Sequence, residues 1–371
     1  MNVPITSHIR RYRLEQGLSQ AQLAKKVGIS RQALILIETQ RQIPSTTLSL
    51  MFSRVLNSSV EALFTLNDGP SQTLIAKGLS STTGRVVLGR VDGELVAHPV
   101  QTERSPADGL IHGPNTGDSR LSVDTLETSP QWDDQVFVAG CAPILGLIAE
   151  SVNRQPGLGR VNWQMSNSSQ SLKMLRSGLV HGGGVHRAPS TKIGAHHQLA
   201  RKTFPKTPMV LVHVAKWKAG LVMSPGNPMG VETGATLLRE DLRWAIREPG
   251  ASAHKLHHEL IENAGGEKRP DVQEKVPKSH QELAMLINYG QADVGVAIEA
   301  VALQKNLDFI PIVEERFDLF FPRHRLEQPA IKRFIDSLSS RGVKQQLCHV
   351  PGYDTSECGH VFECTGQNQD A

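Results

Sequence analysis

Three short segments of small residues could bind a small anion through backbone N–H groups and hydroxyls. They are residues 140–143 (GCAP), 166–169 (SNSS) and 249–252 (PGAS), and each precedes a stretch of helical character. Free N–H groups and the positive dipole end at the start of a helix favour a negatively charged ligand. Candidate ligand-binding residues in and beside these segments are Cys141, Ala142, Ser168, Ser169, Arg247, Gly250 and Ser252. The guanidinium of Arg247 could equally pair with the neighbouring Glu248.

Cys141 could also act as a nucleophile, which would make the protein an enzyme. A thiol at the start of a helix has a lowered pKa and is more reactive. The chain has 15 histidines, but their spacing alone assembles no Cys–His–acid arrangement. We therefore assign no catalytic residue and expect binding chemistry rather than an enzyme. A Cys-dependent enzyme is kept as the weaker alternative.

The other three cysteines lie near the C-terminus, where a zinc site can be considered. Cys348, Cys358 and Cys364 are separated by nine and five intervening residues. Common zinc motifs instead contain closely spaced cysteine pairs. We predict no metal site, although the sequence leaves metal binding by these three residues open. Scattered reduced thiols agree with a cytoplasmic location.

Strands that alternate with helices would place the small-residue segments at one edge of a sheet. QVFVAG, which starts at residue 135, has the apolar run of a buried strand, and CAPILGLIAESVNR after it has helical character. The alternation continues along the chain, which indicates a parallel or mixed α/β sheet with ligands beyond the carboxyl ends of its strands. We expect this domain to cover residues 135–345 and a tail to follow at 346–371.

The region before that domain is rich in turn-forming residues and is predicted to be a linker. Asp92-Gly93 is a strong turn signal between two apolar stretches, which predicts a β-hairpin at residues 85–100. Residues 101–130 are polar and rich in turn formers, so we expect them to be loosely ordered. The linker is therefore set at residues 67–134, after an N-terminal domain of residues 1–66.

Four stretches of the α/β domain resemble a solute-binding-protein-like domain related to the periplasmic molybdate-binding proteins. They are VFVAGCAPILGLIAE, SSQSLKMLRSGLVHGGGVHRA, REPGASAHKLHHEL and SHQELAMLINYGQADVGVAIEAVA. The resemblance implies a type 2 periplasmic-binding-protein-like fold of two α/β lobes around one ligand, with molybdate, tungstate or a small organic anion as candidates. Relatives often have Ser where this chain has Cys141, and Arg where it has His254. His186 and His280 match family positions, and we expect them to be structural.

The N-terminal residues have the pattern of a helix-turn-helix motif. In LSQAQLAKKVGISRQALILIETQ, residues 18–40, apolar side chains recur at helical spacing on both sides of Gly28. Glycine permits the positive φ of a sharp turn, and Ser30 is a favourable N-cap for a second helix. The second helix of such a motif enters the major groove of DNA.

The charge distribution favours a polyanionic partner for this region. Residues 1–66 contain eight Lys and Arg residues and three acidic ones, whereas the formal net charge of the whole chain is +4. Positive charge is therefore concentrated in the N-terminal domain, as expected for a surface that contacts nucleic acid. The chain has no apolar run of about 18 residues and no signal-peptide core, so we expect a cytoplasmic protein without a membrane partner.

Residues 6–66 resemble the Cro/C1-type (XRE) family of helix-turn-helix DNA-binding domains. GLSQAQLAKKVGISRQALILIE follows the family pattern nearly residue by residue. The resemblance implies phosphate contacts from Gln20 and from Arg41. It also implies that Arg31 and Gln32 reach base edges, where Arg favours guanine and Gln favours adenine.

The resemblance further implies a structural ion pair between Arg13 and Glu38. Ile35 and Leu36 depart from the family pattern, which usually has polar or basic residues at these two positions. One interpretation is apolar contact with thymine methyl groups in the major groove. The other places at least one of them in the domain core or against the rest of the chain, and the sequence does not decide between the two.

Together these patterns predict a multidomain protein with an all-α helix-turn-helix head and an α/β two-lobed body. We expect a DNA-binding transcriptional regulator that binds a double-stranded operator as a homodimer. A small anionic ligand in the body would modulate its activity, and no cofactor is required, although bound molybdate or another small anion would be the effector. The alternative is a DNA-binding protein whose body is a scaffold without a ligand.

Overall fold

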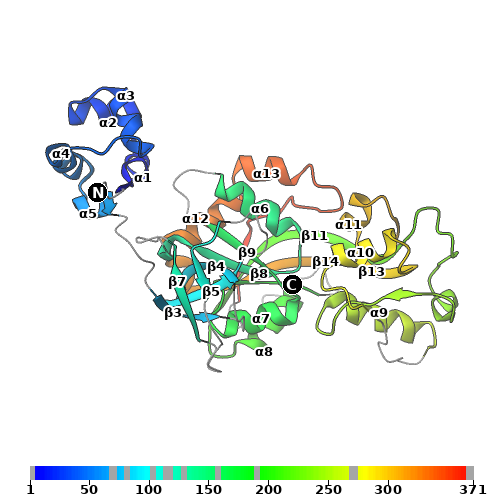
Figure 1. Cartoon of the computed structure of the whole chain (residues 1–371). Helices are drawn as coiled ribbons and strands as arrows, with labels where there is room; N and C mark the ends of the chain where they lie inside the picture. The colour runs from blue at the N-terminus through cyan, green and yellow to red at the C-terminus, as the bar shows by residue number, and fades with distance from the viewer. Residues whose placement is uncertain are drawn as a thin grey trace. The chain divides into compact units, whose positions relative to one another are not determined.

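The computed structural model describes residues 5–66, 73–78, 84–100, 106–111, 120–126, 132–154, 160–187, 193–266 and 275–364. The chain folds as two compact units (Figure 1). One comprises Met1–Gln135 and Asn153–Gly159, and the other comprises Val136–Val152 and Arg160–Ala371. Among the described residues, no helix combines the length and the apolar character needed to cross a membrane.

The N-terminal head consists of short helices closed by a pair of strands. Its elements are β1 (Ile5–Ser7), α1 (Ile9–Glu15), α2 (Gln20–Val27), α3 (Arg31–Glu38), α4 (Thr46–Leu56), α5 (Val60–Leu63) and β2 (Phe64–Leu66). β1 pairs with β2 in antiparallel fashion, so the two ends of the head are held together. The predicted helix-turn-helix is formed by α2 and α3.

Local sequence determines where these two helices begin and end. The Ser19 hydroxyl accepts the N–H of Gln22 at 3.2 Å, and the Gln22 side chain accepts the N–H of Ser19 at 2.7 Å, which forms a capping box. Gly28 ends α2 at a φ of 77°, a conformation that other residues rarely adopt. The Ser30 hydroxyl then caps α3 by accepting the N–H of Ala33 at 3.1 Å.

The head has a buried apolar core and one buried ion pair. The core residues are Ile9, Leu23, Ala24, Val27, Leu34, Ile37, Phe52, Leu56 and Leu63. Beside them the Arg13 Nε lies 2.6 Å from a carboxylate oxygen of Glu38, and both residues are less than 9% exposed. This pair, which the sequence predicted, connects α1 to the end of α3.

Residues assigned to a linker form a closed five-stranded barrel, so that prediction was wrong for the described part of 67–134. The strands are β3 (Thr73–Gly78), β4 (Gly84–Val91), β5 (Glu94–Pro99), β6 (Gly109–Ile111) and β7 (Arg120–Thr125), in the order β3-β5-β4-β6-β7. The Asp92-Gly93 hairpin is confirmed, because Val91 pairs with Glu94. Short strands between turn residues read as loose chain, yet their alternating apolar residues fill the barrel core.

The predicted loose segment, residues 101–130, also contains part of this barrel. β6 and β7 lie within it and pair with each other in antiparallel fashion. Residues 101–105, 112–119 and 127–130 lie outside the described residues, so the prediction is not tested there. Ile111, Leu121 and Val123 are buried in the barrel core, which explains why a segment of polar composition still forms strands.

The body is built on one mixed sheet, as the alternation of strands and helices predicted. The strands are β8 (Val136–Gly140), β9 (Val161–Met165), β10 (Gly182–Arg187), β11 (Met209–Met223), β12 (Trp244–Ala245), β13 (Val294–Ile298), β14 (Asp308–Pro322) and β15 (Val361–Glu363). Their order is β12-β13-β11-β14-β10-β8-β9, and β15 pairs with β11. β11 and β14 are antiparallel along their whole length, so they run through the entire sheet region.

Helices gather at the two ends of β11 and β14 and define two lobes (Figure 1). The first lobe holds β8–β10, α6 (Ile144–Asn153), α7 (Ser168–Arg176), α8 (Ile193–Thr203), α12 (Pro329–Leu338) and α13 (Arg341–Leu347). The second lobe holds β12, β13, α9 (Ser252–Asn263), α10 (His280–Asn288) and α11 (Glu299–Gln304). Of the described helices and strands, β11 and β14 pair with strands of both lobes.

The predicted C-terminal tail belongs to the body as far as the structure describes it. Within 346–364, β15 pairs with β11 from Val361 to Glu363. Cys348 is exposed, Cys358 is buried and Cys364 is half-buried. Within the described part of the chain, these cysteines do not come together as a group of metal ligands.

Removal of one partner of the buried ion pair should destabilise the head. Arg13→Met leaves the Glu38 carboxylate buried with only the Gln20 amide as its side-chain donor, at 3.0 Å. An uncompensated buried charge costs about 3–5 kcal/mol. Hydrogen exchange of the amides of α1–α4, measured by mass spectrometry on the full chain, should show a corresponding loss of protection.

The matched control is the double variant Arg13→Met/Glu38→Met. Because an apolar pair of similar volume is often as stable as a buried ion pair, protection should largely return. A double variant that exchanges as fast as Arg13→Met would contradict the electrostatic explanation.

Candidate functional site

The start of α3 presents the predicted base-contacting residues to solvent. Arg31 and Gln32 are exposed, and so is Arg41 in the loop that follows α3. Leu36 is 39% exposed and Ile35 is half-buried. Neither belongs to the head's apolar core, so the interpretation that placed them in that core is not supported.

Gln20 has a partner within the head that the sequence did not indicate. Its Nε2 donates to Glu38 at 3.0 Å, next to the Arg13 ion pair. Its side chain therefore orients the carboxylate that joins α1 to α3. A phosphate contact by Gln20 stays a prediction, as do the DNA contacts of Arg31, Gln32 and Arg41.

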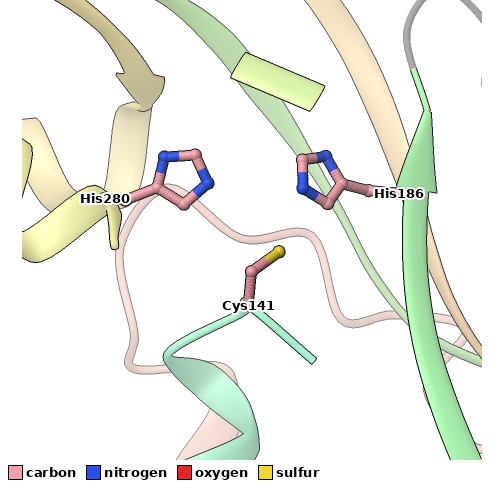
Figure 2. Close-up of side chains that lie close together, drawn as sticks. All are labelled: Cys141, His186 and His280. Carbon is pink, nitrogen blue, oxygen red and sulfur yellow. The ribbon is translucent and has the colours of Figure 1, made fainter. Parts of the chain in front are cut away.

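In the body, Cys141, His186 and His280 come together (Figure 2). The Cys141 Sγ and one ring nitrogen from each histidine all lie within 4.8 Å of one another, and all three residues are buried. Figure 2 shows the two imidazole rings facing each other with the thiol pointing between them. Cys141 and His186 belong to the first lobe, whereas His280 belongs to the second, so this cluster joins the lobes.

Close packing at the end of β8 places the thiol in this cluster. A Cβ at Gly140 would lie 2.9 Å from the end of the Leu145 side chain and 3.1 Å from Phe317, so a larger residue would have to push these side chains aside. The indole N–H of Trp163 donates to the Gly140 carbonyl at 2.8 Å and fixes the turn. Cys141 follows directly and precedes α6.

His186 is held by a buried carboxylate on β14. Its Nδ1 lies 2.6 Å from Glu315, and the Trp217 indole N–H donates to the same oxygen at 2.8 Å. Burial favours the neutral imidazole, but the adjacent Cys141 and Glu315 outweigh it and raise the pKa of His186 to about 10. Burial raises the pKa of Glu315, but His186 and Trp217 overcome that effect and hold it below its ordinary value.

His280 and Arg247 contribute buried polar atoms that have no partner among the described residues. Both ring nitrogens of His280 and the Nη1 of Arg247 are in this state. Burial, together with the positive charges of Arg247 and His186, holds the pKa of His280 well below its ordinary value. The rest of the Arg247 guanidinium is paired, with Nε donating to Glu248 at 2.8 Å. Unpartnered buried polar atoms of this kind point to a missing ligand.

The other predicted ligand residues surround His186, but several have protein partners. The Ser252 hydroxyl donates to the His186 carbonyl at 2.9 Å, and the Ser168 hydroxyl lies 3.4 Å from the His186 amide nitrogen. Gly250 lies against Ser169, since a Cβ at Gly250 would be 3.3 Å from that of Ser169. Ala142 is fully buried beside Cys141. Their contact with an anion stays a prediction.

Sequence reasoning assigned no ligand role to His186 or His280 and did not identify Glu315. The two histidines were expected to be structural, and this stays a prediction, although neither ring nitrogen of His280 has a hydrogen-bond partner among the described residues. A Cys–His–acid arrangement that spacing could not assemble is present as Cys141, His186 and Glu315. Their separation in sequence is large, and only the pairing of β14 with β10 brings Glu315 to His186.

Two family models match this chain. Residues 149–339 match the PBP superfamily domain, and residues 9–63 match a helix-turn-helix model. The uncharacterised Bacillus subtilis protein YvgK is 30% identical over 156 residues, which are 42% of this chain and 50% of that protein. This chain therefore spans half the length of YvgK. An uncharacterised HTH-type transcriptional regulator of Archaeoglobus fulgidus is 37% identical over 62 residues, which are 17% of this chain and 89% of that protein.

Solved structures align with part of this chain. A Clostridium perfringens protein with bound phosphate has a TM-score of 0.46 at 14% identity, over 60% of this chain and 99% of that one. A tungstate ABC transporter structure from Geobacter sulfurreducens has a TM-score of 0.43 at 11% identity, over 57% and 97% of the two chains. From the two family models, the chain belongs to the PBP superfamily and carries an XRE-type helix-turn-helix domain at its N-terminus.

Proposed function

We propose that this protein is a DNA-binding transcriptional regulator whose body responds to a small ligand held between the lobes. The observation that carries the DNA-binding part is the geometry of α3. Its Leu34 and Ile37 are buried in the head, while Arg31, Gln32 and Leu36 face solvent. A helix fixed on one face and polar at its exposed start is suited to reading base edges in a major groove. The HTH-type regulator from Archaeoglobus fulgidus, similar over the head, supports the same function.

A homodimer on a two-fold symmetric operator is part of this proposal. α4 exposes Leu50 by 53% and Met51 by 46%, an apolar pair that a second head could cover. Two half-sites would then lie about one helical turn, roughly 10 base pairs, apart. A footprint with a single half-site would contradict the dimer. With an operator as its partner, the protein is proposed to act in the cytoplasm.

The ligand-responsive part rests on the buried polar atoms between the lobes. The Nη1 of Arg247 has no partner within the described chain, and three helices begin around the site. These features support a small anion such as molybdate, tungstate or an organic acid. Ser252 and Asn167 already join the lobes through bonds of 2.9 Å to His186 and 3.1 Å to Glu248. A ligand that prefers this closed arrangement would shift the population towards it.

Loss of the α3 side chains should weaken specific DNA binding. Arg31→Ala and Gln32→Ala each remove a base-edge contact worth about 1–3 kcal/mol. Fluorescence anisotropy with an operator selected from random duplexes should show this loss, together with relaxed preference at one base position. Lys332→Ala, which removes an exposed charge from α12 in the body, is the matched control and should bind normally. Unchanged affinity in both α3 variants would contradict a recognition role for α3.

Leu36 should contact thymine methyl groups. Deoxyuridine lacks the 5-methyl group, so its substitution for thymine in the selected operator removes only this contact. The wild type should lose affinity on the deoxyuridine operator, whereas Leu36→Ala should bind both operators equally. An equal loss for the wild type and Leu36→Ala would assign the methyl contact to another residue.

Lobe opening should control the reactivity of Cys141. Each hydrogen bond between the lobes contributes about 1 kcal/mol. In the double variant Ser252→Ala/Asn167→Ala, a thiol-alkylating reagent should therefore modify Cys141 roughly tenfold faster or more than in the wild type. Cys358 is fully buried elsewhere in the first lobe and should be unaffected. An anion that binds between the lobes should slow the alkylation of Cys141 and leave that of Cys358 unchanged. The anions to test are molybdate, tungstate, sulfate and carboxylates. Equal acceleration of both cysteines would indicate general unfolding instead of lobe opening.

A further inference from the structure

The cluster of Cys141, His186 and His280 has the composition of a metal site rather than of an oxyanion site. Oxyanion sites are made of N–H and O–H donors, whereas a thiolate and a neutral imidazole donate electron pairs. The raised pKa of His186 keeps its ring protonated in the ion-free cluster, so a cation that binds there would take the place of that proton. One thiolate and two imidazoles are ligands that Zn²⁺ and related borderline cations prefer. The three groups come from three separate elements and converge in a buried position, with their ligand atoms within 4.8 Å of one another.

The surroundings of His186 match those of a metal-bound histidine. Its Nδ1 faces the Glu315 carboxylate at 2.6 Å, so its other ring nitrogen is directed at the cluster. Metal-ligating histidines almost always bond a carboxylate or carbonyl through the second nitrogen, which fixes the ring and strengthens the ligand. The Trp217 N–H in turn holds Glu315 at 2.8 Å. Glu315 therefore orients the ligand residue His186, and Trp217 orients Glu315.

His280 provides the independent sign of a ligand. Its side chain is 2% exposed, and neither ring nitrogen has a hydrogen-bond partner among the described residues. A buried polar group without a partner costs free energy, and native proteins rarely retain one without a reason. A metal ion bound to one ring nitrogen would supply the missing interaction.

The distances require only a small contraction. Bonds of about 2.0–2.3 Å to a tetrahedral ion place ligand atoms roughly 3.5 Å from one another. Cys141 and His186 belong to the first lobe, while His280 begins α10 in the second lobe. A bound ion would therefore pull the lobes together and bridge them.

We propose that Cys141, His186 and His280 bind a transition-metal cation of the Zn²⁺ class, which holds the two lobes in the closed arrangement. The proposal names a ligand class for the ligand-responsive regulator proposed above and rests on it only for the consequence on DNA. Three protein ligands leave one tetrahedral position open. A small anion beside Arg247 is therefore compatible with the ion as its fourth ligand.

Cobalt(II) is the probe, because it substitutes for zinc and reports a thiolate ligand by charge-transfer absorption in the near ultraviolet. The full chain is treated with a chelator and titrated with Co²⁺ alone, without DNA. One equivalent should produce this band, and Zn²⁺ should abolish it by displacement. Cys141→Ser should remove the band, and His280→Gln should weaken Co²⁺ binding by at least about tenfold. Glu315→Gln should keep the band but weaken binding about 10–100-fold.

Cys348→Ser is the matched control, because Cys348 is exposed and lies outside the cluster; its band should equal that of the wild type. Circular dichroism establishes whether each variant is folded. If Cys141→Ser is not folded, His280→Gln provides the test of the site. Absence of the band in folded wild type would overturn the proposal, and so would a band lost in Cys348→Ser but kept in Cys141→Ser. Tight molybdate binding in the presence of chelator, abolished by His280→Gln, would also overturn it in favour of an anion. Operator binding is measured in a separate assay, so the failure of metal binding would leave the DNA-binding proposal unaffected.

Discussion

The pairing of β11 with β14 is the constraint on which the body depends. These two strands stay antiparallel from Met209↔Pro322 to Met223↔Asp308 and are the elements that both lobes share. β14 also carries Glu315 and Asp318, which hold His186 and His196 at 2.6 Å each. The strands that connect the lobes therefore also fix the polar groups of the first lobe, and movement of the lobes acts directly on the site.

The buried carboxylates Asp318 and Glu315 are closely paired, whereas two buried groups at the lobe junction carry polar atoms without a partner in the described part of the chain. Asp318 accepts from His196, from His213 at 2.8 Å and from Arg316 at 2.9 Å, and these bonds outweigh burial to keep its pKa low. Glu315 is balanced by His186 and Trp217. His280 and one nitrogen of Arg247 have no such partner within the described residues. Such unpartnered atoms also occur at Arg316 Nη2 and His196 Nε2, so the ligand-binding role of His280 and Arg247 rests on their position at the lobe junction.

Local signals in the sequence were enough to predict the caps and the turn of the head, because these depend on residues close together in the chain. The Arg13–Glu38 pair was predicted only from the resemblance to the XRE family. The alternation of apolar runs likewise predicted the mixed sheet, and the small-residue segments did converge around His186. Only one hairpin of the barrel was predicted, because its other strands are short, their apolar alternation spans few residues, and turn formers separate them. The cluster of Cys141, His186 and His280 was only partly predicted, since residues about 140 positions apart meet through strand order that sequence spacing does not contain.

The central claim is that the state of the lobe junction alters the affinity of the head for DNA. The direct measurement is fluorescence anisotropy of a labelled operator with the full chain, first with chelator and then with one equivalent of Zn²⁺, for the wild type and His280→Gln. Coupling free energies between sites are typically about 1–3 kcal/mol, or roughly 5–150-fold in affinity. We predict a change in this range for the wild type and none for His280→Gln. Equal operator affinity of the wild type with and without Zn²⁺ would contradict the account.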